Sequence, residues 1–365
     1  MIKRLFLVIE EFNASGGLRV LSAICDVAAV ADIEVTIVCP DYSSVPFFPL
    51  NKKVKVLAIS THQRFSRLRY IYSVCRLRWV SDGLFITGNY RLISLIVAVG
   101  YLAGREKPLF IVQGLDRVSL IELTMTSKIF KQINLLLLGL AQRVSCHRVY
   151  VSSFLKNAHS KPGALIPNFV ASQFFDSQPS EKASISMRIR IGCACTSAPN
   201  KGFRLFLDAF KRMQLDPDLA HHNIEFACAT QDKALALKHA NSGITFVCPA
   251  SDEGMREFYR GCQIFTSLSI SEGFGLPVLE AMASGCAVVC TNSGGVTDFV
   301  LDGETGLLLS ERSAVAVAEA LRLLVLDIPK RETLAAAGKV HARNFTYDRF
   351  ANNYLRLFNE LGASA

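Results

Sequence analysis

The sequence predicts an α/β protein with two successive domains, each built around a parallel β-sheet. Its 365 residues are 50% hydrophobic, which is enough for two cores. Short apolar runs alternate with helical segments, as in βαβ units. A polar stretch over residues 172–186 interrupts this alternation, and the alternation then starts again. The predicted domains are residues 1–170 and 171–345, and a C-terminal helix within 346–365 is expected to pack back on the first domain.

The predicted strands are short runs rich in β-branched and aromatic residues. In the first domain they are residues 5–9, 34–39, 54–59, 83–86, 109–112, 148–151 and 164–166. In the second domain they are residues 188–194, 224–229, 244–248, 263–267 and 287–291. Helical periodicity predicts helices over residues 19–31, 203–212 and 347–361.

Several classes of protein are excluded by composition. The longest apolar stretches, residues 92–103 and 135–141, are well short of the roughly 20 residues that span a bilayer. Residues 1–11 place two basic residues before only five apolar ones, which is too short for a secretory signal. The eleven cysteines contain no C-x-x-C pair and indicate a reducing compartment. We therefore expect a cytoplasmic protein.

The positive charge lies in the first half of the chain. Residues 1–180 carry 21 Lys and Arg against 11 Asp and Glu, whereas residues 181–365 carry 19 against 20. Residues 62–79 interleave aromatic and apolar side chains with five arginines, namely Arg64, Arg67, Arg69, Arg76 and Arg78. Such a helix suits the anionic inner face of a membrane, and the alternative is a solvated basic surface. No zinc-finger spacing or RNP-like motif indicates a nucleic-acid partner.

A glycine-rich loop, Gly273-Phe274-Gly275, follows a predicted strand and precedes a helix that is predicted to begin at Pro277 and to stop at Gly285. Such a loop offers backbone N–H groups and a positive helix end to a phosphate or a sugar hydroxyl. Glu272 and Glu280 flank it, and carboxylates accept hydrogen bonds from hydroxyl groups. The segment therefore indicates a ligand with phosphates and hydroxyls. Spacing alone leaves open a simpler interpretation, a surface acid and a helix-start carboxylate.

Five short motifs in register resemble the retaining glycosyltransferases of family 4, also called glycosyl transferases group 1. They are Gly16-Gly17, residues 166–170 (IPNFV), Lys201-Gly202, the Glu272 to Glu280 segment and residues 302–306 (DGETG). The resemblance implies the GT-B fold, in which two Rossmann-like domains with parallel sheets face a central cleft. It also implies transfer of a hexose or similar sugar from a nucleotide-sugar donor with retention of configuration.

The resemblance also assigns roles to individual residues. It implies a catalytic role for Glu272 and Lys201, with Lys201 neutralising the donor diphosphate. The implied donor-binding residues are Gly16, Gly17, Lys201, Gly273, Phe274, Gly275, Leu276 and Glu280, of which Glu280 binds the ribose. Acceptor contacts are expected at Gln113 and Asp116. No cofactor or metal is expected, although residues 216–218 (DPD) formally match a metal-binding D-x-D pattern.

The expected acceptor is a glycan or a lipid-linked molecule, as in cell-surface polysaccharide or lipopolysaccharide biosynthesis. Two departures from the family pattern favour a different interpretation, a catalytically silent GT-B protein that binds a nucleotide or a protein partner. Thr196 stands where the family usually has an Arg that contacts phosphate, and Gln113 stands where it often has a His. A glutamine side chain cannot act as a base. A GT-B epimerase or phosphorylase is a third alternative.

Overall fold

The computed structural model describes residues 2–12, 15–46, 48–60, 66–114, 128–175 and 188–363. The chain divides into two compact units. The first consists of Met1–Asn168 together with Asp348–Ala365, and the second of Phe169–Tyr347. The C-terminal segment therefore belongs to the same unit as the N-terminal segment.

The first unit is built on a parallel sheet. Its described residues form seven strands in the order β3-β2-β1-β4-β5-β6-β7. The strands are β1 (Arg4–Val8), β2 (Glu34–Pro40), β3 (Lys55–Ile59), β4 (Leu84–Thr87), β5 (Leu109–Val112), β6 (His147–Tyr150) and β7 (Ala164–Leu165). The strands in the middle of the sheet are buried along their whole length, which explains their continuous apolar runs.

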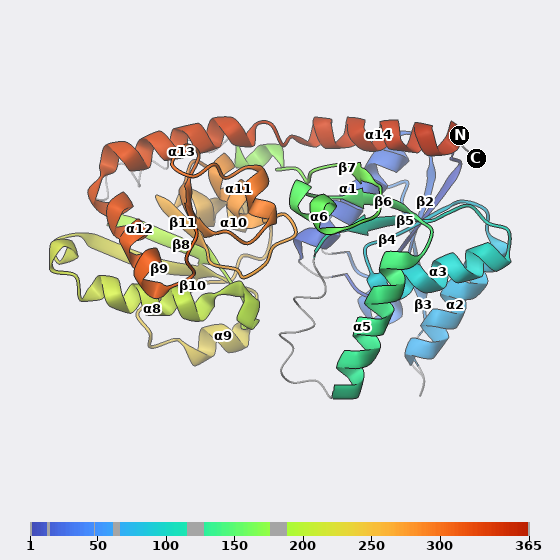
Figure 1. Ribbon diagram of the computed structural model, residues 1–365, viewed down its shortest axis with the longest axis horizontal. Coiled ribbons are helices and arrows are strands. Elements are labelled where there is room, and N and C mark those ends of the chain that lie inside the picture. The colour runs from blue at the N-terminus through green and yellow to red at the C-terminus, as the bar shows by residue number, and fades with distance from the viewer. Residues whose placement is uncertain are drawn as a thin grey trace. The chain divides into compact units, whose positions relative to one another are not determined.

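Helices cover this first sheet (Figure 1). They are α1 (Gly16–Val30), α2 (Ser66–Val80), α3 (Tyr90–Leu102), α5 (Lys128–Arg143), α6 (Ser153–Ala158) and α14 (Tyr347–Ala363). Helix α3 packs against both α2 and α5. Tyr70 and Val74 of α2 enter a core with Phe6 and Phe85, whose rings stack 4.8 Å apart.

One arginine of α2 does not lie where the charge pattern placed it. Arg78 is 1% exposed, and its guanidinium donates to the backbone oxygens of Gly83 and Glu106. Burial of its guanidinium lowers the pKa of Arg78 to about 10. Arg78 therefore holds two loops together and is not part of a basic surface, whereas Arg69 and Arg76 are exposed. Arg64 lies outside the described residues, as does the side chain of Arg67.

The second unit also has a parallel sheet, in which the described residues form six strands in the order β10-β9-β8-β11-β12-β13. The strands are β8 (Arg188–Ala194), β9 (Asn223–Ala229), β10 (Thr245–Val247), β11 (Ile264–Ser267), β12 (Ala287–Thr291) and β13 (Leu307–Leu309). The predicted α/β class with two parallel sheets is confirmed. The sequence did not predict β13, because three leucines are too short a run to be recognised as a strand.

The helices of the second unit are α8 (Phe203–Gln214), α9 (Lys233–Lys238), α10 (Asp252–Arg260), α11 (Leu276–Ala283), α12 (Ala314–Leu326) and α13 (Ile328–Ala342). Figure 1 shows α8 and α9 on one side of the strands and α11 and α13 on the other. Right-handed crossovers require this arrangement, because the chain moves outward through α8 and α9 and returns through α10 and α11. None of the described helices is both long and apolar enough to span a bilayer.

Candidate functional site

The loops after β8 and β11 bring Lys201 and Glu272 together at the carboxyl edge of the second sheet. The Nζ atom of Lys201 lies 2.7 Å from Oε1 of Glu272, and the hydroxyl of Ser269 donates to the same oxygen at 2.7 Å. The side chains of Lys201 and Glu272 are 36% and 17% exposed, so this pair is open to a ligand. An ammonium group has three donors, and two remain for another partner.

Gly202 explains why Lys201 can lie so close to this strand end. It has φ +78°, and a Cβ atom there would lie 2.2 Å from the backbone oxygen of Leu268. Only glycine avoids this clash while adopting a left-handed conformation. The thiol of Cys195 donates to the backbone oxygen of Lys201 at 3.4 Å. The lysine is therefore held against the strand end by its own backbone.

Loop Gly273–Leu276 is anchored on both sides. The N–H of Glu272 donates to Ser293 O at 2.7 Å, and the N–H of Gly295 donates to Glu272 O at 3.0 Å. The approach at Gly295 is so close that a Cβ atom would lie 2.3 Å from Gly273 O. Within the part of the chain that the structure describes, the four consecutive N–H groups from Gly273 to Leu276 donate to no protein acceptor. They form a row of donors at the positive end of α11, where an anion is favoured.

The side chains of Phe274 and Leu276 face the core and not this edge. Phe274 is 3% exposed, and its ring centroid lies 5.2 Å from that of Phe299 and 5.9 Å from that of Phe345. Leu276 is also buried. At both positions only the backbone can contact a ligand, and the buried side chains anchor the loop to the core.

Glu280 has different surroundings from Glu272. It is 5% exposed on α11, and the hydroxyl of Tyr259, on α10, donates to its Oε2 at 3.0 Å. A carboxylate has two oxygens and about four acceptor positions, so it can accept several hydrogen bonds at once. Tyr259 and Ser269 were not recognised from the sequence. Ser269 stands two residues after the end of a predicted strand, which is a usable signal, whereas nothing in the sequence connects Tyr259 with Glu280.

In the first unit, the structure brings Gly17 and Gln113 together. Gly16 and Gly17 are the first residues of α1, not a preceding loop, and the hydroxyl of Ser15 accepts from the N–H of Leu18. The side-chain amide of Gln113 donates to Gly17 O at 2.9 Å. A Cβ atom at Gly17 would lie 2.6 Å from Oε1 of Gln113, so a larger residue there would displace the Gln113 side chain. The predicted acceptor residue Asp116 lies outside the described residues.

The loop that leads to Lys201 is held by Asp232. Its Oδ2 accepts from the N–H of Ser197 at 2.8 Å, and its Oδ1 accepts from the N–H of Leu235 at 3.0 Å. The hydrogen bonds that Asp232 accepts lower its pKa to about 2. The largest effect comes from the hydroxyl of Ser197, followed by the backbone N–H groups of Leu235 and Ser197. Thr196, in the same loop, is exposed and accepts from the N–H of Ala198 at 3.3 Å. A threonine supplies no positive charge to a phosphate.

The D-x-D pattern, residues 216–218, lies away from the carboxyl edge of the second sheet. The guanidinium of Arg322, on α12, lies 3.0 Å from Asp216 and also pairs with Asp218. Asp216 in addition accepts from the N–H of Asp218 and so begins a short turn. Among the described residues, no three His, Cys, Asp or Glu side chains are grouped as metal ligands would be.

A family model matches part of the second unit. Residues 188–327 match the family model described as glycosyl transferases group 1. The D-inositol 3-phosphate glycosyltransferase of Stackebrandtia nassauensis is 38% identical over 117 residues, which are 32% of this chain and 26% of that protein. The enzyme of the same name from Corynebacterium diphtheriae is 35% identical over 115 residues, again 32% and 26% of the two chains. The match thus spans about a quarter of the length of these relatives.

Structural comparison covers the whole chain. Sucrose-phosphate synthase from Thermosynechococcus elongatus aligns with a TM-score of 0.79 at 17% identity, covering 100% of both chains. HepE from Anabaena, solved with UDP-glucose, aligns with a TM-score of 0.74 at 15% identity, covering 98% of this chain and 99% of that one. The chain therefore has the GT-B fold, and its residues 188–327 match the glycosyl transferases group 1 family that the sequence motifs predicted.

Proposed function

We propose that this protein is a glycosyltransferase that moves a sugar from a nucleotide-sugar donor to a hydroxyl group of an acceptor, with retention at the anomeric carbon. One observation carries the proposal. The row of N–H donors from Gly273 to Leu276 lies at the same sheet edge as the pair of Lys201 and Glu272. This arrangement combines positive charge for a diphosphate with a carboxylate for sugar hydroxyls. The match of residues 188–327 to glycosyl transferases group 1 supports it.

The donor is held by groups of the second unit. Lys201 and the N–H row bind the diphosphate, Glu280 accepts hydrogen bonds from the ribose hydroxyls, and Glu272 binds the donor sugar. A buried carboxylate such as Glu280 suits this task because its desolvation is offset by the hydrogen bonds it accepts. UDP-linked sugars are the first donors to test, since the HepE structure of the same fold is described with UDP-glucose.

The reaction needs positioning and stabilisation of the leaving group. The bond between the anomeric carbon and the diphosphate oxygen breaks, and a bond to the acceptor oxygen forms on the same face of the sugar. The departing diphosphate takes the acceptor proton. Lys201 and the N–H row stabilise the charge that grows on the diphosphate, and they do so in fixed positions. We propose that this charge stabilisation replaces a catalytic metal.

We propose that the acceptor is a glycan or a lipid-linked molecule, as in polysaccharide or lipopolysaccharide assembly, and that α2 docks on an anionic membrane surface. Leu68, Tyr72 and Trp79 are each more than half exposed and share one face of α2 at spacings of four and seven residues. Arg69 and Arg76 are exposed as well. Exposed aromatic and apolar groups beside arginines are typical of helices that lie in a membrane interface.

The neighbouring helices also carry exposed apolar side chains. Tyr101 and Leu102 end α3, which packs against α2, and Leu136 lies on α5, which packs against α3. All three side chains are more than half exposed. These residues would strengthen binding to a membrane interface, because the free energy of that binding scales with the apolar area that is buried.

The proposed activity is tested by incubating the full chain with a panel of nucleotide sugars and measuring release of the nucleoside diphosphate. We expect release with one donor class, and loss of that release in Lys201→Ala. Binding of a nucleotide without release or transfer for any donor, with lipid-linked and glycan acceptors present, would favour the catalytically silent alternative. A Lys201→Arg variant keeps the charge and is expected to retain part of the activity.

A further inference from the structure

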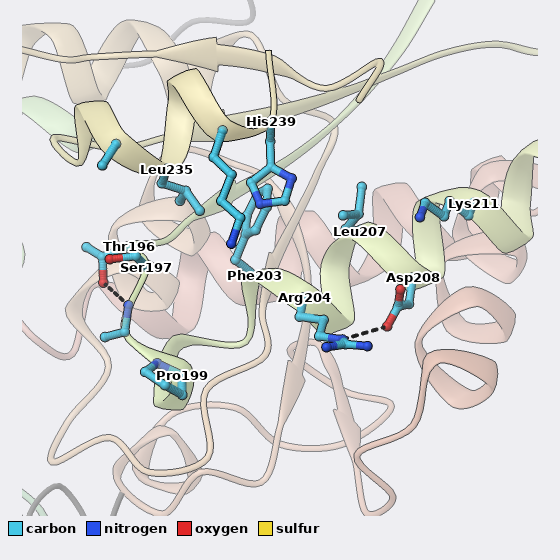
Figure 2. A pocket seen from close by; sticks show the side chains of 13 residues that line it. Thr196, Ser197, Pro199, Phe203, Arg204, Leu207, Asp208, Lys211, Leu235 and His239 are labelled. Carbon is cyan, nitrogen blue, oxygen red and sulfur yellow. Dashed lines mark hydrogen bonds and ion pairs between the residues drawn. The ribbon is translucent and has the colours of Figure 1, made fainter. Parts of the chain in front are cut away.

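The second unit contains a pocket that the proposed reaction does not use. It has a volume of about 430 Å³ and lies between α8 and α9 (Figure 2). Phe203, Leu207 and Leu235 provide apolar surface, with Phe203 and Leu235 buried. The ring of His239 lies 4.9 Å from that of Phe203 at an angle of 56°. This volume is within the range of small-molecule sites, about 300 to 1,000 Å³.

The rim of this pocket is basic. Arg204, Lys211 and Lys238 line it, together with a single carboxylate, Asp208. Asp208 lies 3.9 Å from Arg204, so one of the three cations already has an acidic partner. Lys211 and Lys238 form no ion pair with the described ranges of the chain. Two lysines therefore remain for an anion beside an apolar surface.

The pocket lies on one face of the second sheet, whereas Tyr259 and Glu280 of the proposed donor site lie on helices of the other face. Helices α8 and α9 cover one face, whereas α10 and α11, which carry Tyr259 and Glu280, cover the other. The wall at one end of the pocket is formed by Thr196 and the residues up to Pro199, as Figure 2 shows. Lys201 ends the short turn that Pro199 begins, and its side chain is directed to Glu272. Neither Lys201 nor Glu280 lines this pocket.

We propose that the pocket between α8 and α9 binds a small amphipathic anion, an aromatic or branched aliphatic group that carries a phosphate. The apolar group would contact Phe203, Leu207 and Leu235, the apolar side chains that line the pocket. The phosphate would be bound by the lysines of the rim, because an ammonium group is a compact charge suited to phosphate oxygens. The volume accommodates an organic monophosphate but not a folded macromolecule.

The test uses 1-naphthyl phosphate as the probe and isothermal titration calorimetry of the full chain. We expect binding of one molecule per chain, and much weaker binding of 1-naphthol or inorganic phosphate alone, since each has only half of the required groups. The double variant Lys211→Gln with Lys238→Gln is expected to weaken binding roughly tenfold or more, the usual effect of losing a charge-assisted hydrogen bond. Leu207→Trp, which fills the pocket, is expected to abolish binding.

The matched control is Arg212→Gln with Lys233→Gln, which removes two positive charges from the same two helices outside the pocket lining. It should bind the probe as the parent protein does, and all variants should unfold at a similar temperature. The proposal is overturned if the control loses as much affinity as the pocket variant, or if Leu207→Trp binds normally. Displacement of the probe by UDP, or loss of binding in Lys201→Ala, would place the probe at the donor site and would also overturn it.

Discussion

Nζ of Lys201 lies 2.7 Å from Oε1 of Glu272, although 71 residues separate the two in sequence. The same carboxylate oxygen accepts a hydrogen bond from Ser269. The pair fixes the position of an ammonium group whose other two donors remain for a ligand. It also places a carboxylate beside the N–H row of Gly273 to Leu276, so positive charge and a hydroxyl acceptor are available together.

Lys201→Ala is expected to lower kcat/KM for the donor roughly a hundredfold or more, the usual effect of removing one preorganised electrostatic donor. Its stability should change little, because a partly exposed ion pair is worth about 0 to 1 kcal/mol. Steady-state kinetics and urea unfolding measure the two effects. A variant that unfolds early but transfers sugar normally while folded would show that Lys201 is structural.

Glu280→Gln is expected to weaken UDP binding by about tenfold or more, since hydrogen bonds to a charged acceptor are worth roughly 1.5 to 3 kcal/mol. Tyr259→Phe is the matched control, because it removes the hydroxyl that donates to Glu280 but keeps the carboxylate. Calorimetric titration with UDP should show a smaller loss for this control. Equal affinity of Glu280→Gln and the parent protein would contradict the ribose assignment.

Gly295→Ala is expected to displace the donor loop, because the added Cβ atom would lie 2.3 Å from Gly273 O. Backbone atoms cannot yield as a flexible side chain can, so the N–H row should lose its geometry and UDP affinity should fall. Gly139→Ala, on α5, is the control, since a Cβ atom there meets nothing within 4 Å. If Gly295→Ala folds and binds UDP normally, the loop is not the diphosphate site.

Arg69→Gln combined with Arg76→Gln is expected to lower binding to anionic vesicles about thirtyfold, at roughly 1 kcal/mol for each arginine. Cosedimentation with vesicles of phosphatidylcholine and phosphatidylglycerol measures this effect. The pair Arg212→Gln and Lys233→Gln, in the second unit, removes the same charge and should bind as the parent does. Equal binding by all three proteins would mean that α2 is a solvated face.

Arg78→Gln separates the buried arginine from the exposed ones. It removes donors to the backbone oxygens of Gly83 and Glu106, so it should destabilise the protein. Vesicle binding of the folded fraction should be unchanged. Thermal unfolding monitored by circular dichroism gives the first result, and a melting temperature equal to that of the parent would contradict the role of Arg78.

Asp232→Ala is expected to lower the melting temperature at pH 7, because Asp232 accepts from Ser197 and caps α9. The pKa of Asp232 is depressed from 3.8 to about 2, so its contribution is fully present above about pH 4 and is lost as the pH falls through 2. The difference in melting temperature between the two proteins should therefore shrink between pH 4 and pH 2. A difference that stays constant over this range would contradict the assignment.

The strands were the most predictable part of the fold. The bounds of β5 and β12 agree with the predicted runs because buried parallel strands are continuous apolar segments between turns. The bounds of β8 agree as well, although only Ile191 to Cys193 are buried in it. Helix α11 starts one residue before Pro277, and it ends near Gly285, as expected from the residue preferences of helix ends. Helix α2 was harder, because a charge pattern cannot distinguish the buried Arg78 from the exposed Arg76.

The candidate site was predictable in part. The motifs identified Lys201, Glu272 and the glycine loop, and parallel-sheet topology explains why such loops meet at one edge. The contact of Gln113 with Gly17 spans 96 residues, and no local pattern gives its distance. The burial of Phe274 and the donation from Tyr259 to Glu280 depend on packing between elements, which periodicity alone does not determine.

Retaining sugar transfer at this sheet edge is tested by proton NMR of the anomeric signals during turnover of an α-linked UDP-sugar by the full chain. We predict that the donor signal decays while UDP accumulates and that the first new glycosidic signal has the α configuration. Glu272→Gln and Lys201→Ala should slow both changes together. A product with the β configuration would contradict the retaining mechanism, and an unchanged rate in both variants would contradict the assignment of the reaction to this sheet edge.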